Sequence, residues 1–383
     1  MIEPRNPFIL GHRISRPYFC DRIEEEKTLI ASIRNERNVV MISPRRMGKT
    51  SLIYVSLHES PEIENEYLTF FFDILQTNSL AEFTFLLGKA IFDKLRKKSE
   101  SGLRGFLAAL KSIKGTFGFD PITGTPTFNL QLGDIQNPEY TLEEIFGFLE
   151  RSERPVIVVI DEFQQISKYP EKNVEALLRT HIQRMSNATF IFSGSEKTLL
   201  HEMFVSSKRP FYKSAEIMHL SAIPQDTYVE FARKLFSDRG KTLEPDPVRW
   251  AFDLFGGNTF YLQRTMNGAF AETAEGDACG EEHVRRSVKG MLAANEVMYR
   301  EILSNISVNQ KALLLAIAKD KIAISPLSGT FIKRHSLPSA SSVQSALGIL
   351  LRNGLIAKEE DSYRINDPLL RIFINNIYCI PEF

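Results

Sequence analysis

The stretch Ser43–Ser51, SPRRMGKTS, constrains the fold of this chain more than any other. It follows a short apolar run, Val39–Ile42, typical of a buried parallel strand, and it leads into a helical pattern at Thr50–Glu59. A loop between such a strand and a helix presents backbone N–H groups at the positive end of the helix dipole, where phosphate oxygens bind. The sequence therefore predicts a phosphate-binding loop here.

Three residues of the loop supply the parts that phosphate binding needs. Gly48 belongs to the backbone cradle, the Lys49 ammonium reaches the terminal phosphates, and the Thr50 hydroxyl ligates Mg²⁺. The usual pattern begins with glycine where this chain has Ser43, which is small and can bond its own backbone, while Pro44 presets φ. A chance Gly-Lys-Thr at a helix start is the alternative. The residues predicted to bind nucleotide here are Ser43, Pro44, Arg45, Arg46, Met47, Gly48, Lys49, Thr50 and Ser51.

A second apolar strand ends in two acids. Residues Val156–Glu162, VIVVIDE, place Asp161 and Glu162 at the carboxyl end of a predicted parallel strand, the edge at which α/β sheets bind ligands. There Asp161 would hold Mg²⁺, and Glu162 would polarise the attacking water as general base. An acidic turn that caps the next helix is the alternative for such a strand in isolation. Together with the loop, the pair predicts a nucleotide site in which Lys49 and Glu162 are catalytic.

Strands and helices alternate around these motifs, which predicts an α/β fold with a parallel sheet of βαβ units. Further strands are predicted at 67–75, 188–192 and 215–220, and helices at 80–97, 140–151 and 173–185. Another helix is predicted from Asp21, with this residue as its N-cap. Residues 115–133 interrupt the alternation with apolar and polar residues in turn, which predicts an inserted β-hairpin.

The pattern after Pro224 is mostly helical, so three parts are predicted. The P-loop core occupies 1–223, a helical lid 224–305, and a winged-helix domain 306–383. In the last part, three predicted helices precede two short strands around an acidic turn. That order is typical of a winged helix.

The winged-helix domain has little of the charge that DNA binding requires. From Glu301 onward it carries nine Lys/Arg against seven Asp/Glu, and the predicted wing contains Glu359, Glu360 and Asp361, which would repel phosphate. The predicted recognition helix, 339–353, offers mainly serine and glutamine on its outer face. DNA is therefore a weakly supported partner, and contact with a protein client or self-association is at least as well supported.

Composition places the chain among ordinary globular proteins. Of its 383 residues, 43% are hydrophobic and 25% charged, and 47 Lys+Arg balance 47 Asp+Glu, so any nucleic-acid surface would be local. No secretory signal begins the sequence, and no run of about 18 apolar residues suits a membrane span. Cys20, Cys279 and Cys379 are far apart and suggest neither disulfides nor a zinc site. We expect a cytoplasmic protein.

These motifs together resemble the archaeal-type ATPases of the STAND branch, relatives of the AAA+ proteins and of the archaeal replication initiators. The resemblance extends over nearly the whole chain. The segments that carry it are Tyr18–Glu24 (YFCDRIE), Arg45–Thr50 (RRMGKT), Ile160–Gln164 (IDEFQ), Phe190–Ser195 (FIFSGS), Gly256–Leu262 (GGNTFYL) and Asp367–Leu370 (DPLL). It implies an ATPase that binds ATP or ADP with Mg²⁺.

The resemblance also implies further site residues. Phe19 and Arg22 would flank the adenine, and Asn258 would approach the nucleotide from the lid. Ser193, or Ser195 in its place, would contact the γ-phosphate or the lytic water, although a serine cap at a strand end is an equal alternative. Lys208 and Arg209 stand where relatives place an arginine finger, with surface solvation the favoured alternative. The sequence departs from the family at Thr259, where proline is usual, and at Lys213-Ser214, where glycine-arginine is usual.

Three classes of function follow. The first is a nucleotide-driven regulatory switch that hydrolyses ATP slowly. The second is an ATP-dependent DNA-binding protein that uses the winged helix. The third is an interaction scaffold that holds nucleotide without turnover, which the intact Asp161-Glu162 pair argues against.

Overall fold

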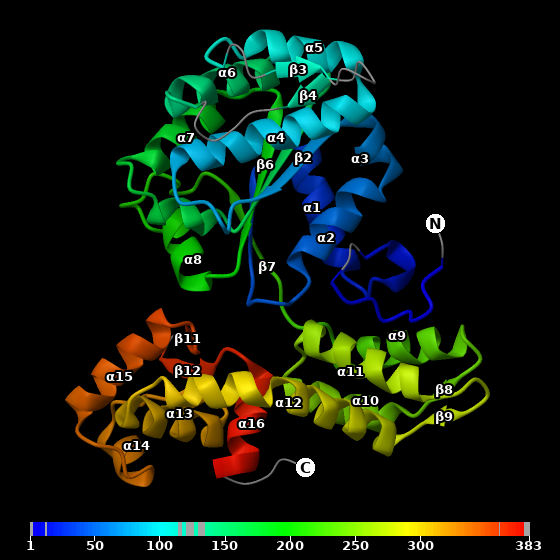
Figure 1. Cartoon of the computed structure of the whole chain (residues 1–383), viewed down its shortest axis with the longest axis vertical. Coiled ribbons are helices and arrows are strands. Elements are labelled where there is room, and N and C mark those ends of the chain that lie inside the picture. The colour runs from blue at the N-terminus through cyan, green and yellow to red at the C-terminus, as the bar shows by residue number, and fades with distance from the viewer. Residues whose placement is uncertain are drawn as a thin grey trace. The chain divides into compact units, whose positions relative to one another are not determined.

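The computed structural model describes residues 3–11, 14–113, 117–119, 126–128, 135–359 and 361–378. The chain forms two compact units (Figure 1). One comprises Arg13–Ser221, and the other combines the N-terminal segment Met1–His12 with Ala222–Phe383. Among the described helices, none combines the length and the apolar character needed to cross a membrane.

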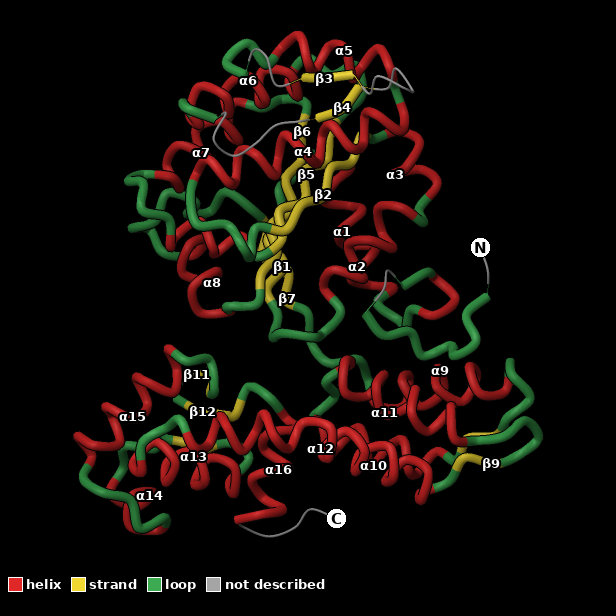
Figure 2. Tube along the Cα trace, viewed as in Figure 1, coloured by secondary structure: helices red, strands yellow, loops and turns green. Residues whose placement is uncertain are grey.

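A five-stranded parallel sheet forms the centre of the unit Arg13–Ser221 (Figure 2). Its strands are β1 (Val39–Ile42), β2 (Leu68–Asp73), β5 (Val156–Asp161), β6 (Ala188–Gly194) and β7 (Glu216–His219). Their spatial order is β2-β5-β6-β1-β7, and every pairing is parallel. All five carboxyl ends therefore lie at one edge, and the predicted α/β parallel-sheet fold is confirmed.

Helices connect these strands and cover both faces of the sheet (Figure 1). They are α1 (Ile23–Arg34), α2 (Lys49–His58), α3 (Pro61–Glu66), α4 (Leu80–Lys98), α5 (Glu100–Ala109), α6 (Pro138–Glu150), α7 (Val174–Arg184) and α8 (Lys197–Val205). Two 3-10 helices, η1 (Arg16–Tyr18) and η3 (Phe163–Lys168), complete the described helical elements of this unit.

Alternate side chains of each strand enter opposite halves of the core, because successive residues of a strand face opposite sides of a sheet. In β1, Val39 and Met41 pack with side chains of α1 and α2. Val40 and Ile42 pack with those of α4, α6 and α7 on the other face. All four are at most 1% exposed. This double burial fixes the direction in which the chain leaves β1 and enters the phosphate loop.

Two local predictions have different outcomes. The predicted hairpin at 115–133 contains β3 (Phe117–Phe119) and β4 (Pro126–Phe128), which pair antiparallel, and its turn lies outside the described residues. The predicted N-cap Asp21 is wrong. Helix α1 begins at Ile23, and its N-cap is Arg22, which has a left-handed backbone (φ 71) and no side-chain cap.

The other unit begins with a helical region that the N-terminal segment covers. Its helices are α9 (Gln225–Ser237), α10 (Pro245–Phe255), α11 (Thr259–Glu272) and α12 (Glu281–Ser304), with the short parallel pair β8 (Thr242–Leu243) and β9 (Ala278–Cys279). Phe8 is fully buried against the rings of Phe236 and Phe270. Asn267 donates to the Phe8 carbonyl at 2.7 Å, and Asn6 donates to the Asn267 carbonyl at 2.9 Å.

The C-terminal region of this unit is a winged helix, as predicted. Its helices are α13 (Val308–Asp320), α14 (Gly329–Arg334), α15 (Ala340–Arg352) and α16 (Pro368–Tyr378), and its strands are β10 (Ala323–Ile324), β11 (Ile356–Glu359) and β12 (Ser362–Ile365). The strands form an antiparallel sheet in the order β10-β12-β11. The strand β10 was not predicted, because it is only two residues long and lacks a periodic signal.

Asp367 joins the helical region to the winged helix. The Tyr261 hydroxyl of α11 donates to its Oδ1 at 2.5 Å, and the Tyr299 hydroxyl of α12 donates to its Oδ2 at 2.9 Å. Oδ1 also accepts the backbone N–H groups of Leu369 and Leu370, at the start of α16. Burial, reinforced by the Asp367 charge, raises the pKa of Tyr299, which keeps its hydroxyl protonated as a donor.

We predict that Asp367→Ala lowers the free energy of unfolding by about 3 kcal/mol, because two buried tyrosine hydroxyls lose their acceptor. Urea denaturation at constant m-value measures the change. Asp361→Ala, at an exposed position of the wing, is the matched control and should change stability by less than about 0.5 kcal/mol. Equal stability of the two variants would show that this junction contributes nothing.

Candidate functional site

The phosphate loop occupies residues 43–48, between the end of β1 and the start of α2. The Ser43 side chain is fully buried, and its hydroxyl donates to the Pro44 carbonyl at 3.0 Å, so serine takes the place of the usual first glycine without exposing a polar group. Gly48 is the N-cap of α2 with φ 89, a left-handed conformation that favours glycine. The loop thus ends at a helix N-terminus, where backbone N–H groups are available to phosphate oxygens.

Lys49 is the first residue of α2, and its side chain is only 7% exposed. Burial lowers the pKa of Lys49, while the negative charges of Asp161 and Glu162 oppose this shift and the positive charge of Arg45 adds to it. A phosphate beside the ammonium would supply further negative charge and favour the protonated form. The site is therefore electrostatically suited to an anionic ligand.

Asp161, at the end of β5, lies between two hydroxyl groups. Thr50 Oγ1 donates to Asp161 Oδ2 at 2.9 Å, and Ser193 Oγ donates to Asp161 Oδ1 at 2.5 Å. Asp161 is 5% exposed and Ser193 fully buried. The hydroxyl of Ser193 is thus already bonded to Asp161, a geometry that favours orienting this acid over direct contact with phosphate.

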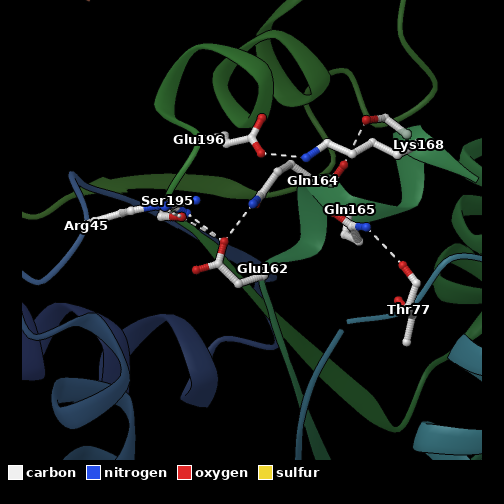
Figure 3. A network of polar contacts seen from close by, with 9 residues as sticks. Arg45, Thr77, Glu162, Gln164, Gln165, Lys168, Ser195 and Glu196 are labelled. Atoms are coloured by element: carbon white, nitrogen blue, oxygen red, sulfur yellow. Dashed lines mark hydrogen bonds and ion pairs between the residues drawn. The ribbon is translucent and has the colours of Figure 1, made fainter. Parts of the chain in front are cut away.

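Glu162 follows Asp161 in a left-handed backbone conformation, with φ 56. Its Oε2 accepts bonds from Ser195 Oγ at 2.9 Å, from the Ser195 N–H at 3.2 Å and from Gln164 Nε2 at 2.6 Å (Figure 3). Arg45 Nε donates to Ser195 Oγ at 3.2 Å, so the network reaches the phosphate loop. This network could not be predicted from the sequence, because it depends on side-chain directions.

Asp73 is a third carboxylate at the same edge of the sheet, and it was not among the predicted site residues. It ends β2 and is paired in register with Asp161. Partial burial raises the pKa of Asp73, and the charges of Asp161 and Glu162 add to the shift. The signal was present in the sequence, since the predicted strand at 67–75 contains this acid near its carboxyl end.

The predicted adenine-side residues lie beside the loop. Arg22 is 3% exposed; its Nη1 pairs with Glu25 Oε1 at 2.7 Å, and its Nη2 donates to the Met47 carbonyl at 3.4 Å. Phe19 is half-buried against the hydrophobic cluster that includes Met47. Arg22 therefore supports the phosphate loop through its contact with the Met47 carbonyl, and this contact does not depend on the nucleobase.

The remaining predicted residues have local partners. Asn258 belongs to the other unit, where it is the N-cap of α11 and accepts the Tyr261 N–H at 3.4 Å. Arg209 forms an ion pair with Glu175 at 2.5 Å within its own chain. Of the loop residues, Met47 is buried, Pro44 and Ser51 are half-buried, and Arg45, Arg46 and Thr50 are exposed. Cys20 and Cys279 are buried free thiols, and Cys379 lies outside the described residues.

The oxygen atoms of Thr50 and Asp161 fit Mg²⁺. The hydroxyl and the carboxylate approach within 2.9 Å of each other, and both are hard donors of the type that magnesium prefers. Magnesium characteristically takes one or two protein oxygens together with phosphate and water. The pair therefore suits an ion held jointly with a bound nucleotide.

The parallel sheet, the loop at a helix N-terminus and the acid pair on a neighbouring strand define a P-loop NTPase fold. Residues 19–265 match the family described as "ATPase domain predominantly from Archaea", and the chain belongs to this family. Residues 297–376 match the family of probable winged helix domains. No curated protein sequence matches the chain.

Solved structures with the same fold cover nearly all of the chain. A Walker-type ATPase from Pyrococcus abyssi is 20% identical, with a TM-score of 0.67, and the match covers 96% of this chain and 99% of that one. The ORC2 protein of Aeropyrum pernix, in ADPNP–ADP complexes, has 16% identity, a TM-score of 0.60 and 97% coverage of both chains. The ORC1 protein of Aeropyrum pernix, in complex with DNA, has 13% identity, a TM-score of 0.53 and 97% coverage of both. At these identities the likeness is one of fold.

We predict that Gly48→Ala lowers the free energy of unfolding by about 1–2 kcal/mol and weakens nucleotide binding, because φ 89 strains any residue with a Cβ. Thermal unfolding and titration with a fluorescent ATP analogue measure the two effects. Gly348→Ala, in the interior of α15 with open space around its Cα, is the matched control and should be neutral or stabilising. If Gly48→Ala bound the ATP analogue as tightly as the wild type, the assignment of the loop to the nucleotide site would be wrong.

Proposed function

We propose that this chain binds ATP with Mg²⁺, hydrolyses it slowly, and uses the nucleotide state as a regulatory switch. The observation that carries the proposal is the position of Asp161. One of its carboxylate oxygens accepts a hydrogen bond from the Thr50 hydroxyl, and the other accepts one from the Ser193 hydroxyl. A loop threonine next to a buried strand-end aspartate is the pair that holds Mg²⁺ in P-loop NTPases. Membership of the ATPase family supports the same reaction.

Each side chain has a separate task in this proposal. The loop N–H groups and Lys49 hold the phosphates, and Thr50 and Asp161 hold Mg²⁺, which when bound would neutralise charge on the terminal phosphates. Ser193 orients Asp161. Glu162 takes a proton from water, whose oxygen forms a bond to the γ-phosphorus while the bond to the β–γ bridging oxygen breaks and ADP leaves.

We predict that Glu162→Gln binds ATP with wild-type affinity but loses on the order of 10²- to 10⁴-fold in turnover, since the amide cannot accept the proton. Lys49→Ala should instead weaken ATP binding, because it removes the buried cation. Phosphate release and nucleotide titration separate the two effects. Glu196→Gln, which only breaks an ion pair with Lys168, is the matched control and should hydrolyse ATP normally. Wild-type turnover by Glu162→Gln would refute the assignment of the base.

The switch rests on the connection between the helical region and the winged helix. Asp367 bonds to tyrosines of α11 and α12, and Arg371 of α16, 8% exposed, donates to the Leu254 carbonyl of α10 at 2.7 Å. Because Asn258 caps α11 three residues before Tyr261, a shift of this segment would pass directly to Asp367. The predicted lid at 224–305 and winged helix at 306–383 would then respond to nucleotide together.

We predict that the winged helix changes its distance from the ATPase core between the ADP state and that of a non-hydrolysable ATP analogue. Dyes on Ser101→Cys and Ser345→Cys, two exposed positions, report the change as energy transfer. The same pair in a Lys49→Ala background is the control and should not respond at equal nucleotide concentration. Identical energy transfer in both nucleotide states would contradict the switch. ATP hydrolysis without a switch, or a nucleotide-holding scaffold, would then remain as functions.

DNA is the second candidate partner, because the similar ORC1 structure from Aeropyrum pernix contains it. The first candidate partner is a protein client or a second copy of the chain, because the winged-helix region carries little net positive charge to attract DNA. Duplex binding that falls steeply with salt and changes with nucleotide would favour DNA. Binding that is absent at low salt would favour a protein contact.

A further inference from the structure

The carboxylate of Glu162 is held through one of its two oxygens. Its Oε2 accepts three hydrogen bonds, two from Ser195 and one from Gln164, and the last is the shortest at 2.6 Å (Figure 3). Within the described part of the chain, no donor reaches Oε1. The carboxylate is thus fixed in direction, with its second oxygen open to another partner.

Gln164 is the member of this network that has no contact with solvent. It is 0% exposed, although it lies only two residues from Glu162 on η3. The left-handed backbone of Glu162 turns the chain at this point, so that the Gln164 amide faces back toward the carboxylate. The Gln164 N–H₂ must face Glu162, because the flipped amide would place its oxygen against a carboxylate oxygen.

A glycine on the neighbouring strand leaves room for this amide. A Cβ at Gly194, the last residue of β6, would lie 2.0 Å from Gln164 Oε1. Among the described residues, Gln164 Oε1 is buried and has no hydrogen-bond partner, while the N–H₂ group of the same amide donates to Glu162. A role in catalysis is one of the reasons for which native proteins keep a buried polar atom unpaired.

We propose that Gln164 is the positioning residue for the general base Glu162. By binding Oε2, it holds the carboxylate in one rotamer and directs Oε1 to the water that attacks the γ-phosphate. The proposal rests on the proposed function, in which Glu162 takes the proton of that water. A general base contributes to the rate only when it is held within hydrogen-bond reach of the proton it abstracts, so loss of the restraint lowers turnover and leaves nucleotide binding intact.

The neighbouring Gln165 provides a matched control. It is 9% exposed, and its Nε2 donates to the Thr77 carbonyl at 2.9 Å, away from Glu162 (Figure 3). Gln164→Met and Gln165→Met each replace a buried amide by an apolar chain of similar length and each remove one hydrogen bond. The two variants therefore differ in the acceptor that loses its hydrogen bond, which is Glu162 in Gln164→Met and the Thr77 carbonyl in Gln165→Met.

The test measures single-turnover ATP hydrolysis with enzyme in excess, together with ATP affinity and thermal unfolding. We expect Gln164→Met to hydrolyse ATP on the order of 10- to 100-fold more slowly at an affinity within about twofold of wild type. Gln165→Met should turn over like wild type at comparable stability. Equal turnover by the Gln164 and Gln165 variants, or faster turnover by Gln164→Met, would overturn the proposal.

A double-mutant cycle separates this proposal from the one on which it rests. In a Glu162→Gln background, Gln164→Met should cause no further loss, because its effect passes through Glu162. If Glu162→Gln itself hydrolyses like wild type, the proposed base fails; if it is slow while Gln164→Met is normal, only the positioning role fails. Gly194→Ala displaces the amide without removing it and should slow turnover in the same way, which keeps the test open if Gln164→Met does not fold.

Discussion

The candidate site depends on the two hydrogen bonds that Thr50 and Ser193 donate to the Asp161 carboxylate. These bonds connect parts of the chain that belong to three separate strands or follow them. Ser193 comes from β6, which pairs with β5 and β1, and Thr50 comes from the helix that follows β1. In the order β2-β5-β6-β1-β7, only β6 lies between the strand that precedes the loop and the strand that ends in the acids. The burial of both faces of the sheet therefore does more than stabilise the fold, since it sets the distance between the phosphate loop and Asp161.

Much of this arrangement could be predicted from the sequence, because it follows from period and position. Short apolar runs predict parallel strands, and the carboxyl ends of such strands meet at one edge, so the loop at 43–51 and the acids Asp161 and Glu162 were expected to lie together. The structure places them together, with Thr50 and Asp161 in hydrogen-bond contact. The winged helix was also confirmed, and its predicted helix at 339–353 agrees with α15 (Ala340–Arg352), which is amphipathic. The catalytic and metal-binding roles, and the three-part division of the chain, stay predictions.

What could not be predicted depends on side-chain directions and on rare backbone conformations. A capping signal at Asp21 was wrong because Arg22 adopts a left-handed backbone, from which its guanidinium reaches the Met47 carbonyl. The contact between Gln164 and Glu162 needs both a left-handed residue and a glycine on another strand. Likewise, the family segments that contain Tyr261 and Asp367 are about a hundred residues apart, and only the packed structure reveals that they share a hydrogen bond.

The N-terminal segment completes the core of a unit from which it is distant in sequence. Because Met1–His12 belongs to the same unit as Ala222–Phe383, the chain passes between the two units at two places in the sequence. Phe8, buried against the rings of Phe236 and Phe270, forms part of the core of the helical region. Removal of this segment would therefore expose the rings of Phe236 and Phe270, although in sequence the segment adjoins the ATPase core.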